Sequence, residues 1–127
     1  MNERFLFRGR KVNSFGEDVG DGWAQGNLII WGPEDGKLYS IALVSAPYTA
    51  YQVDPATIGQ CTGLRDKNGV LIFEGDVLSD TDYGTAPVRW SDDRWVLAFP
   101  DRDECITEFL DVMVVVGNIH DNPDKTR

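Results

Sequence analysis

Residues 54–78 read DPATIGQCTGLRDKNGVLIFEGDVL, and this stretch decides the fold of the 127-residue chain. Asp54 can accept hydrogen bonds from the unpaired amides of a turn, and Pro55 has the φ angle that suits a first helical position. We therefore expect one helical turn over residues 55–58, which Gly59 stops. Residues 60–64 then read as an extended segment that Gly63 interrupts.

The second half of the stretch predicts a hairpin and a further turn. Asn68-Gly69 lies between two apolar runs and tolerates the positive φ of a two-residue type I′ turn, so residues 66–69 should join two antiparallel strands. After the apolar strand 70–73, Glu74-Gly75-Asp76 predicts another tight turn. The residues expected to set these turns are Gly59, Gly63, Asn68, Gly69, Gly75 and Asp76.

The remaining sequence predicts more short strands. Residues 4–10 alternate as a half-buried strand, with Phe5 and Phe7 on one face and the arginines on the other. Residues 23–31 and 37–45 predict a hairpin around the turn 32–36, and residues 48–53 a short strand. Residues 87–90 and 95–99 predict another hairpin, in which Trp90 and Trp95 pack across the strands.

Two segments near the C-terminus complete the prediction. Ile106, Phe109 and Leu110 stand at helical spacing, so residues 104–110 predict a short amphipathic helix in competition with a strand. The β-branched residues 112–119 predict a last strand before a frayed tail at 122–127. The core should include Trp23, Ile72, Phe73, Val77, Trp90, Val114 and Ile119.

Composition favours one small β domain. The chain has 13 glycines and 14 aromatic residues, four of them tryptophan, which suits short strands and tight turns better than a helix bundle. We therefore predict a mainly β fold, a small antiparallel, strongly coiled sheet or barrel-like β domain with one or two short helical turns. A single domain should cover residues 1–127.

The cysteine pattern and the hydropathy of the sequence indicate the cellular compartment in which we expect the protein. Two cysteines without CxxC spacing, Cys61 and Cys105, and one histidine argue against structural zinc and favour a reduced, cytoplasmic protein. The N-terminus has no apolar signal-peptide core, and the longest apolar run, 112–116, is too short to span a bilayer. No membrane association, metal or cofactor is expected.

Charge is the bulk property that points most directly to partners. The chain has 21 acidic and 12 basic residues, a formal net charge of −9, and eleven carboxylates against three arginines between residues 74 and 111. The basic residues Arg4, Arg8, Arg10 and Lys11 gather instead at the N-terminus. Nucleic-acid binding by most of the surface is therefore disfavoured, while a basic protein partner, or mimicry of DNA, is compatible with it. The alternative interpretation is that the acids only solvate loops and keep a small protein soluble.

No catalytic pattern emerges. Asp80-Thr81-Asp82 before Gly84 hints at calcium but lacks the further ligands of an EF-hand. His120 has no evident nucleophile beside it, Asp92-Asp93 reads as a solvated turn, and the glycines form no phosphate-binding loop. A small enzyme, or a metal- or nucleotide-binding protein that uses clustered acids, is kept as an alternative.

Five blocks of sequence resemble the YopX family of phage and prophage proteins. They are Phe7-Arg8-Gly9-Arg10, Trp23-Ala24-Gln25-Gly26, Thr57-Ile58-Gly59-Gln60 with Thr62 to Gly69, Phe73 to Val77, and Val116 to Pro123. The resemblance implies a compact β-rich fold encoded on a mobile element of a bacterial host, with no established activity to transfer. The glycine-rich loop 13–21 and Cys61 depart from the family pattern.

These observations predict an accessory protein that works by protein–protein contact and is not an enzyme. The expected contact residues are Asp80, Asp82, Asp92 and Asp93 on an acidic face, with Arg8 and Arg10 on a basic strand whose edge serves self-association. The expected partners are a second copy of the chain and a basic host or phage protein. Direct nucleic-acid binding through the N-terminal cations is the remaining alternative.

Overall fold

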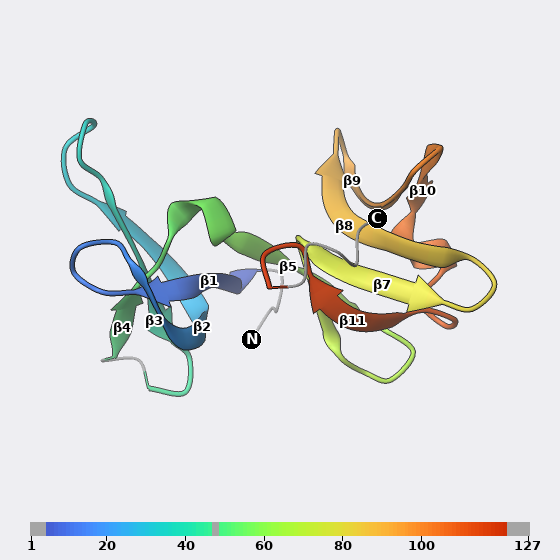
Figure 1. Ribbon diagram of the computed structural model, residues 1–127, viewed down its shortest axis with the longest axis horizontal. Coiled ribbons are helices and arrows are strands. Elements are labelled where there is room, and N and C mark those ends of the chain that lie inside the picture. Colours follow the sequence, from blue (N-terminus) through green and yellow to red (C-terminus); the bar gives the residue numbers. More distant parts are fainter. Residues whose placement is uncertain (1–4, 47–48, 122–127) are drawn as a thin grey trace. The chain divides into compact units, whose positions relative to one another are not determined.

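The structure, a computed structural model, describes residues 5–46 and 49–121, apart from the side chains at positions 19 and 21. It is mainly β, with antiparallel pairing throughout the described strands (Figure 1). The chain forms two compact units, residues 1–60 (unit 1) and 61–127 (unit 2). The closed or strongly coiled form of the sheet stays a prediction.

Unit 1 is a meander of four strands followed by one helical turn. Its elements are β1 (Phe7–Val12), β2 (Asp18–Trp31), β3 (Leu38–Leu43), β4 (Ala50–Gln52), the 3-10 turn η2 (Pro55–Thr57) and the first two residues of β5 (Gly59–Arg65). The strand order is β4-β3-β2-β1, and the start of β5 pairs with β1. Ala24, Ile41 and Val53 form its core.

The sequence predictions for unit 1 need two corrections. The N-terminal strand starts at Phe7, and Phe5 precedes it with 66% of its surface exposed, so Phe5 and Phe7 do not share a buried face. Strand β1 is also paired on both sides, because Asp54 N donates to Arg10 O at 3.0 Å on the side opposite β2. It is therefore an interior strand of the sheet, and the prediction that its edge is free for self-association is wrong. Arg4 and Tyr48 lie outside the described residues.

Unit 2 begins within β5 and continues as a second meander. Its further elements are β6 (Leu71–Phe73), β7 (Asp76–Asp80), β8 (Gly84–Ser91), β9 (Arg94–Phe99), β10 (Arg102–Cys105), the 3-10 turn η3 (Ile106–Glu108) and β11 (Val114–Asn118). β6 pairs with β5, and the sheet order of the other strands is β10-β9-β8-β7-β11, yellow to red in Figure 1. The core cluster includes Ile72, Leu78, Leu97, Ile106 and Met113.

The predicted hairpin at residues 66–69 is confirmed, but its turn type is not. Gly69 has a φ of +83°, whereas Asn68 is not in the left-handed region, so the type I′ turn is wrong. Gly69 N donates to Asp66 O at 3.0 Å and Asp66 N to Val70 O at 2.9 Å. This pattern is a type I turn followed by a left-handed glycine, the usual three-residue hairpin loop.

Three other expectations for unit 2 are corrected. Residues 104–110 form the end of β10 and the single turn η3 and not an amphipathic helix. Trp90 and Ile119, expected in the core, are 48% and 37% exposed. Trp90 does pack against Trp95, with ring centroids 5.0 Å apart, because the two residues are cross-strand partners on β8 and β9. The tail 122–127 lies outside the described residues.

Candidate interaction surfaces

The outer face of unit 1 carries two arginines around a tryptophan. We define this face as the side of β1, β2 and β3 opposite the core residue Ala24. Trp23 lies on it directly across from Arg10, so the prediction that Trp23 is a core residue is wrong; its side chain is half-buried. The guanidinium carbon of Arg8 lies 4.9 Å from the Trp23 ring centroid, and that of Arg10 lies 5.7 Å away. Both distances suit cation–π attraction, so the two cations and the indole form one cluster.

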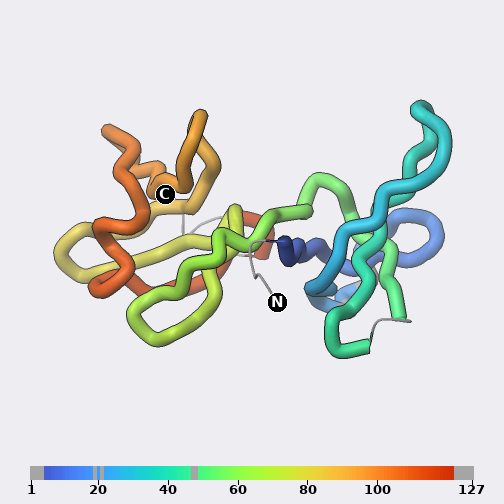
Figure 2. Tube along the Cα trace, turned by 180° about the vertical axis from the view of Figure 1, so that it is seen from behind, coloured from blue at the N-terminus to red at the C-terminus, as the bar shows by residue number. Residues whose placement is uncertain are grey.

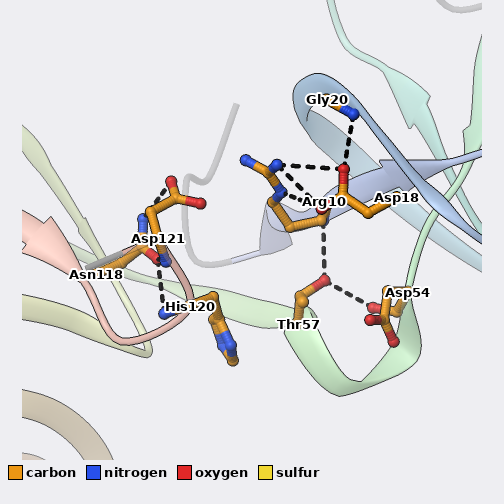
Figure 3. Close-up of polar contacts among 8 residues, drawn as sticks. All are labelled: Arg10, Asp18, Gly20, Asp54, Thr57, Asn118, His120 and Asp121. Atoms are coloured by element: carbon orange, nitrogen blue, oxygen red, sulfur yellow. Dashed lines mark hydrogen bonds and ion pairs between the residues drawn. The ribbon is translucent and has the colours of Figure 1, made fainter. Parts of the chain in front are cut away.

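A carboxylate at the start of β2 holds one of these arginines. Arg10 Nε donates to Asp18 Oδ2 at 3.0 Å, and Arg10 Nη2 lies 3.0 Å from the same oxygen (Figure 3). Gly20 N donates to Asp18 Oδ1 at 2.8 Å. The Gly20 amide first, and then Arg10, lower the pKa of the Asp18 carboxyl below its ordinary value. The ion pair fixes the Arg10 guanidinium beside Trp23.

The backbone of β1 is tied to the η2 turn. Arg10 N donates to Thr57 Oγ1 at 2.9 Å, and that hydroxyl donates to Asp54 O at 2.7 Å (Figure 3). Asp54 Oδ1 accepts from Ala56 N at 3.0 Å, so Asp54 caps η2 as its sequence predicts. These bonds set the position of the arginine-bearing strand.

The N-terminal cations do not share one face. Lys11 follows Arg10 in β1 and points to the other side, where its Nζ lies 4.1 Å from the Tyr51 ring centroid. A phosphate backbone needs cations along one continuous surface. Lys11 therefore does not extend the cationic surface that Arg8 and Arg10 form.

The end of the β2–β3 hairpin is apolar and exposed. Figure 2 shows this hairpin, in cyan, reaching beyond the other strands of unit 1. Its apolar side chains are Ile29, Ile30, Trp31 and Leu38, which are 43%, 51%, 57% and 37% exposed. We call these four residues the apolar ribbon. Trp31 pairs with Leu38 across the strands.

Sequence reasoning placed this hairpin but missed its exposure. The available signal was the run Leu28-Ile29-Ile30-Trp31, which is apolar at consecutive positions. Consecutive residues of a strand point to opposite faces, so a continuous apolar run needs cover on both sides. At the end of a two-stranded hairpin neither face is fully covered.

The four acidic residues that the sequence predicts as contacts divide between two turns. Asp80 and Asp82 belong to the turn between β7 and β8, and Asp92 and Asp93 to the turn between β8 and β9. The turns are therefore at opposite ends of β8, about 26 Å apart for eight residues of strand. The structure brings together the members of each pair but not the two pairs.

The four acids differ in exposure and in whether their carboxylates form hydrogen bonds within the turn. Asp80 is half-buried, and its Oδ2 accepts from Asp82 N at 2.9 Å and Tyr83 N at 3.3 Å, so it builds the turn. Asp92 is exposed with a φ of +55°, a left-handed conformation that aspartate tolerates better than most residues. Asp82 and Asp93 are exposed and are the clearest members of an acidic surface.

His120 and Cys105, the other residues considered for chemistry, lie in segments held by local hydrogen bonds. Asn118 Oδ1 accepts from His120 N at 2.9 Å and Asp121 N at 2.8 Å, and Asn118 Nδ2 donates to Asp121 Oδ2 (Figure 3). Cys105, half-buried, has its Sγ 3.2 Å from Thr107 Oγ1, and this hydrogen bond lowers the pKa of the thiol. Within residues 5–46 and 49–121, no three potential metal ligands cluster.

The fold and these surfaces define a small antiparallel β protein with a cationic aromatic cluster, an apolar ribbon and acidic turns. The family model of the YopX protein matches residues 34–125. The chain therefore belongs to the YopX family, as its sequence blocks predict, although the blocks at 7–10 and 23–26 precede the matched region.

A solved structure extends the comparison. The chain is similar to the crystal structure of protein EF1440 from Enterococcus faecalis, with 26% sequence identity and a TM-score of 0.50. The match covers 94% of each chain. Comparison with curated proteins gives no match. Among the described residues, no helix has the length and apolar character needed to cross a membrane.

Proposed function

We propose that this protein is a phage or prophage accessory factor that works in the host cytoplasm as a protein–protein interaction module and not as an enzyme. The observation that carries the proposal is the apolar ribbon. Three neighbouring side chains at one hairpin end, Ile29, Ile30 and Trp31, are each more than two-fifths exposed. A cluster of exposed apolar residues rimmed by polar ones is typical of a surface that binds another protein.

The composition of the ribbon supports this role. Trp31 is the residue type most enriched at binding hot spots, and its neighbours Ile29 and Leu38 supply flat apolar area around it. The tip of the hairpin carries exposed Glu34 and Asp35. A partner that covers the ribbon therefore meets an apolar centre and an acidic rim, which favours a basic protein or a basic surface of the chain itself.

A photo-crosslinking residue at position 31 tests the proposal in the producing bacterium. We expect irradiation to give covalent adducts with one or a few proteins, identified by mass spectrometry, because the ribbon lies against its partner. The matched control carries the same residue at Phe15, an aromatic that is 84% exposed in the β1–β2 loop. If position 31 yields no more adduct than position 15, the ribbon is not an interaction surface and the proposal is wrong.

A further inference from the structure

The last five residues of β2 have a strand neighbour on one side only. β1 pairs with β2 as far as Phe7 opposite Gly26, whereas β3 follows β2 to its last residue, Trp31. Among the residues that the structure describes, positions 27–31 therefore pair with β3 alone. We call the other side of residues 27–31 the open edge.

The hydrogen bonding of β3 shows which backbone groups face the open edge. Val53 N donates to Tyr39 O at 2.9 Å, so Tyr39 directs its backbone groups away from β2. Tyr39 is the cross-strand partner of Ile30. Antiparallel partners exchange both hydrogen bonds or neither, and the two kinds of pair alternate along the strand. Ile30 and, two residues before it, Leu28 therefore direct N–H and C=O to the open edge, while Ile29 bonds to β3.

The open edge lacks the features that usually prevent a strand from adding to a sheet. Natural edges are protected by charged side chains, prolines or bulges. Residues 27–31 read NLIIW and pair with β3 in unbroken register. The ribbon residues Ile29, Ile30 and Trp31 alternate between the two faces of the strand beside this edge. An added strand would satisfy the backbone groups and cover the ribbon together.

The size of the open edge favours an extended segment over a folded partner. Five residues of strand span about 17 Å, and such an edge buries less than the roughly 800 Å² per partner of a standard interface. A second copy that pairs Leu28 with Ile30 in both directions places its Gly32 opposite Gly26, where Phe7 already lies. A single extended segment needs only the space in line with β1.

The turn that follows β2 indicates the charge of the segment. Glu34 and Asp35 are exposed there, and Lys37 lies 3.3 Å from Glu34, so two acids and one lysine leave the turn negative. A basic residue on the segment complements this charge. The nearest cation at the other end of the edge, Arg8, lies over Trp23 on the outer face.

We propose that the open edge of β2 binds an extended segment of another protein as an added antiparallel strand, with apolar side chains against the ribbon and a basic residue beside the turn 32–36. The proposal rests on the proposed function and gives the chemistry of its partner. Backbone hydrogen bonds to Leu28 and Ile30 supply affinity, and the side chains of Ile29 and Trp31 select apolar residues.

Amide hydrogen exchange of the full chain tests this geometry with a probe peptide, acetyl-Lys-Lys-Thr-Val-Ile-Val-Thr-amide. In the free chain the amides of Leu28 and Ile30 should exchange faster than those of Asn27 and Ile29, which bond to β3. Saturation with the probe should slow Leu28 and Ile30 roughly tenfold or more and change the other two little. Absence of binding at millimolar probe, or binding without this protection, overturns the proposal.

Removal of backbone donors separates strand addition from side-chain docking. A probe with the same side chains, methylated at the amide nitrogens of Thr-Val-Ile-Val-Thr, should bind roughly tenfold more weakly or worse. Ile30→Pro removes an N–H that faces the open edge and should have a similar effect, whereas the matched control Ile30→Ala keeps that N–H and should weaken binding only about threefold. Circular dichroism checks the folding of both variants. Equal affinity of the two probes overturns the proposal whether or not Ile30→Pro folds.

Cross-linking at position 31 separates this inference from the proposed function. If adducts form, but the purified partner leaves the exchange of Leu28 and Ile30 unchanged, the strand-addition proposal is wrong and the proposed function stands. Protection of Leu28 and Ile30 when the chain alone is concentrated would identify a second copy as the occupant, which also overturns the proposal. Absence of both adducts and probe binding overturns both.

Discussion

Unit 1 and unit 2 are both antiparallel meanders, yet they bury their apolar residues to different degrees. Among the residues that the structure describes, nine buried residues form a core cluster in unit 2, and Ala24, Ile41 and Val53 form a smaller one in unit 1. In unit 2 the segment around η3 packs Ile106, Phe109 and Met113 against the sheet as a cover. In unit 1 the hairpin of β2 and β3 runs past its core and leaves the apolar ribbon exposed.

This difference teaches that exposure follows from what covers a strand and not from its hydrophobicity. Residues 70–73 and 28–31 are both apolar runs. Ile72 is fully buried, whereas Ile30 is 51% exposed. We therefore expect unit 2 to supply most of the structural stability, while unit 1 carries the proposed binding surface.

Alanine substitutions in the two units should give the largest contrast. Leu97→Ala removes a fully buried side chain from the core of unit 2 and should lower the free energy of unfolding by about 3 kcal/mol, through lost burial and the cavity left behind. Ile30→Ala, in the ribbon, should cost less than about 1 kcal/mol in the monomer because the side chain is half-exposed. Urea unfolding of dilute protein followed by circular dichroism measures both values. Equal losses would contradict the assignment of roles.

Two turn aspartates give a second, smaller contrast. Asp66, which is 6% exposed, accepts from Asn68 N at 2.8 Å, Val70 N at 2.9 Å and Val115 N at 2.8 Å. Its replacement by alanine removes the acceptor of three part-buried amides and should cost about 3 kcal/mol. Asp54→Ala removes only the cap of η2 and should cost about 1 kcal/mol.

Urea unfolding measures the free energy of unfolding of both alanine variants. Asp66→Asn is the control, because it removes the charge at nearly constant shape. The asparagine retains one acceptor oxygen, so its cost should lie between those of wild type and Asp66→Ala. An Asp54→Ala variant less stable than Asp66→Ala would reverse the proposed order of the two turns.

The carboxylate of Asp66 also explains where sequence reasoning about the fold stopped. Asn68-Gly69 correctly located the hairpin, because glycine at the left-handed position is a local requirement. The turn type depended on a side chain: Asp66 Oδ1 accepts from both Asn68 N and Val70 N, which stabilises a three-residue loop over the two-residue alternative. A dipeptide signal does not include that competing acceptor.

The surfaces were predictable only where they depend on local strand geometry and not on how distant segments meet. Alternation along β1 correctly placed Arg8 and Arg10 on one face, since it depends only on strand geometry. It did not predict Asp18 as the partner of Arg10, because that contact depends on how the loop 13–17 closes. The two acidic pairs looked like one face only while the length of β8 between them was unknown.

The Arg10–Asp18 pair gives the smallest expected effect, and a pH titration detects it best. Because the pKa of Asp18 is lower in the folded protein than its ordinary value of 3.8, the ionised carboxylate stabilises the fold above that value. The contribution should be lost as the pH falls through the folded pKa, where Asp18 gains a proton. Carbon-detected NMR of the carboxyl group should show this lowered pKa.

Substitution of either partner separates the two causes of the shift. In Arg10→Met the Gly20 amide remains, so the pKa of Asp18 should rise only part of the way toward 3.8, because the Gly20 hydrogen bond is the larger cause. Stability at neutral pH should change little, since exposed ion pairs contribute little. A return of the pKa to its full ordinary value in Arg10→Met would show that the arginine, and not the turn of β2, holds the carboxylate ionised.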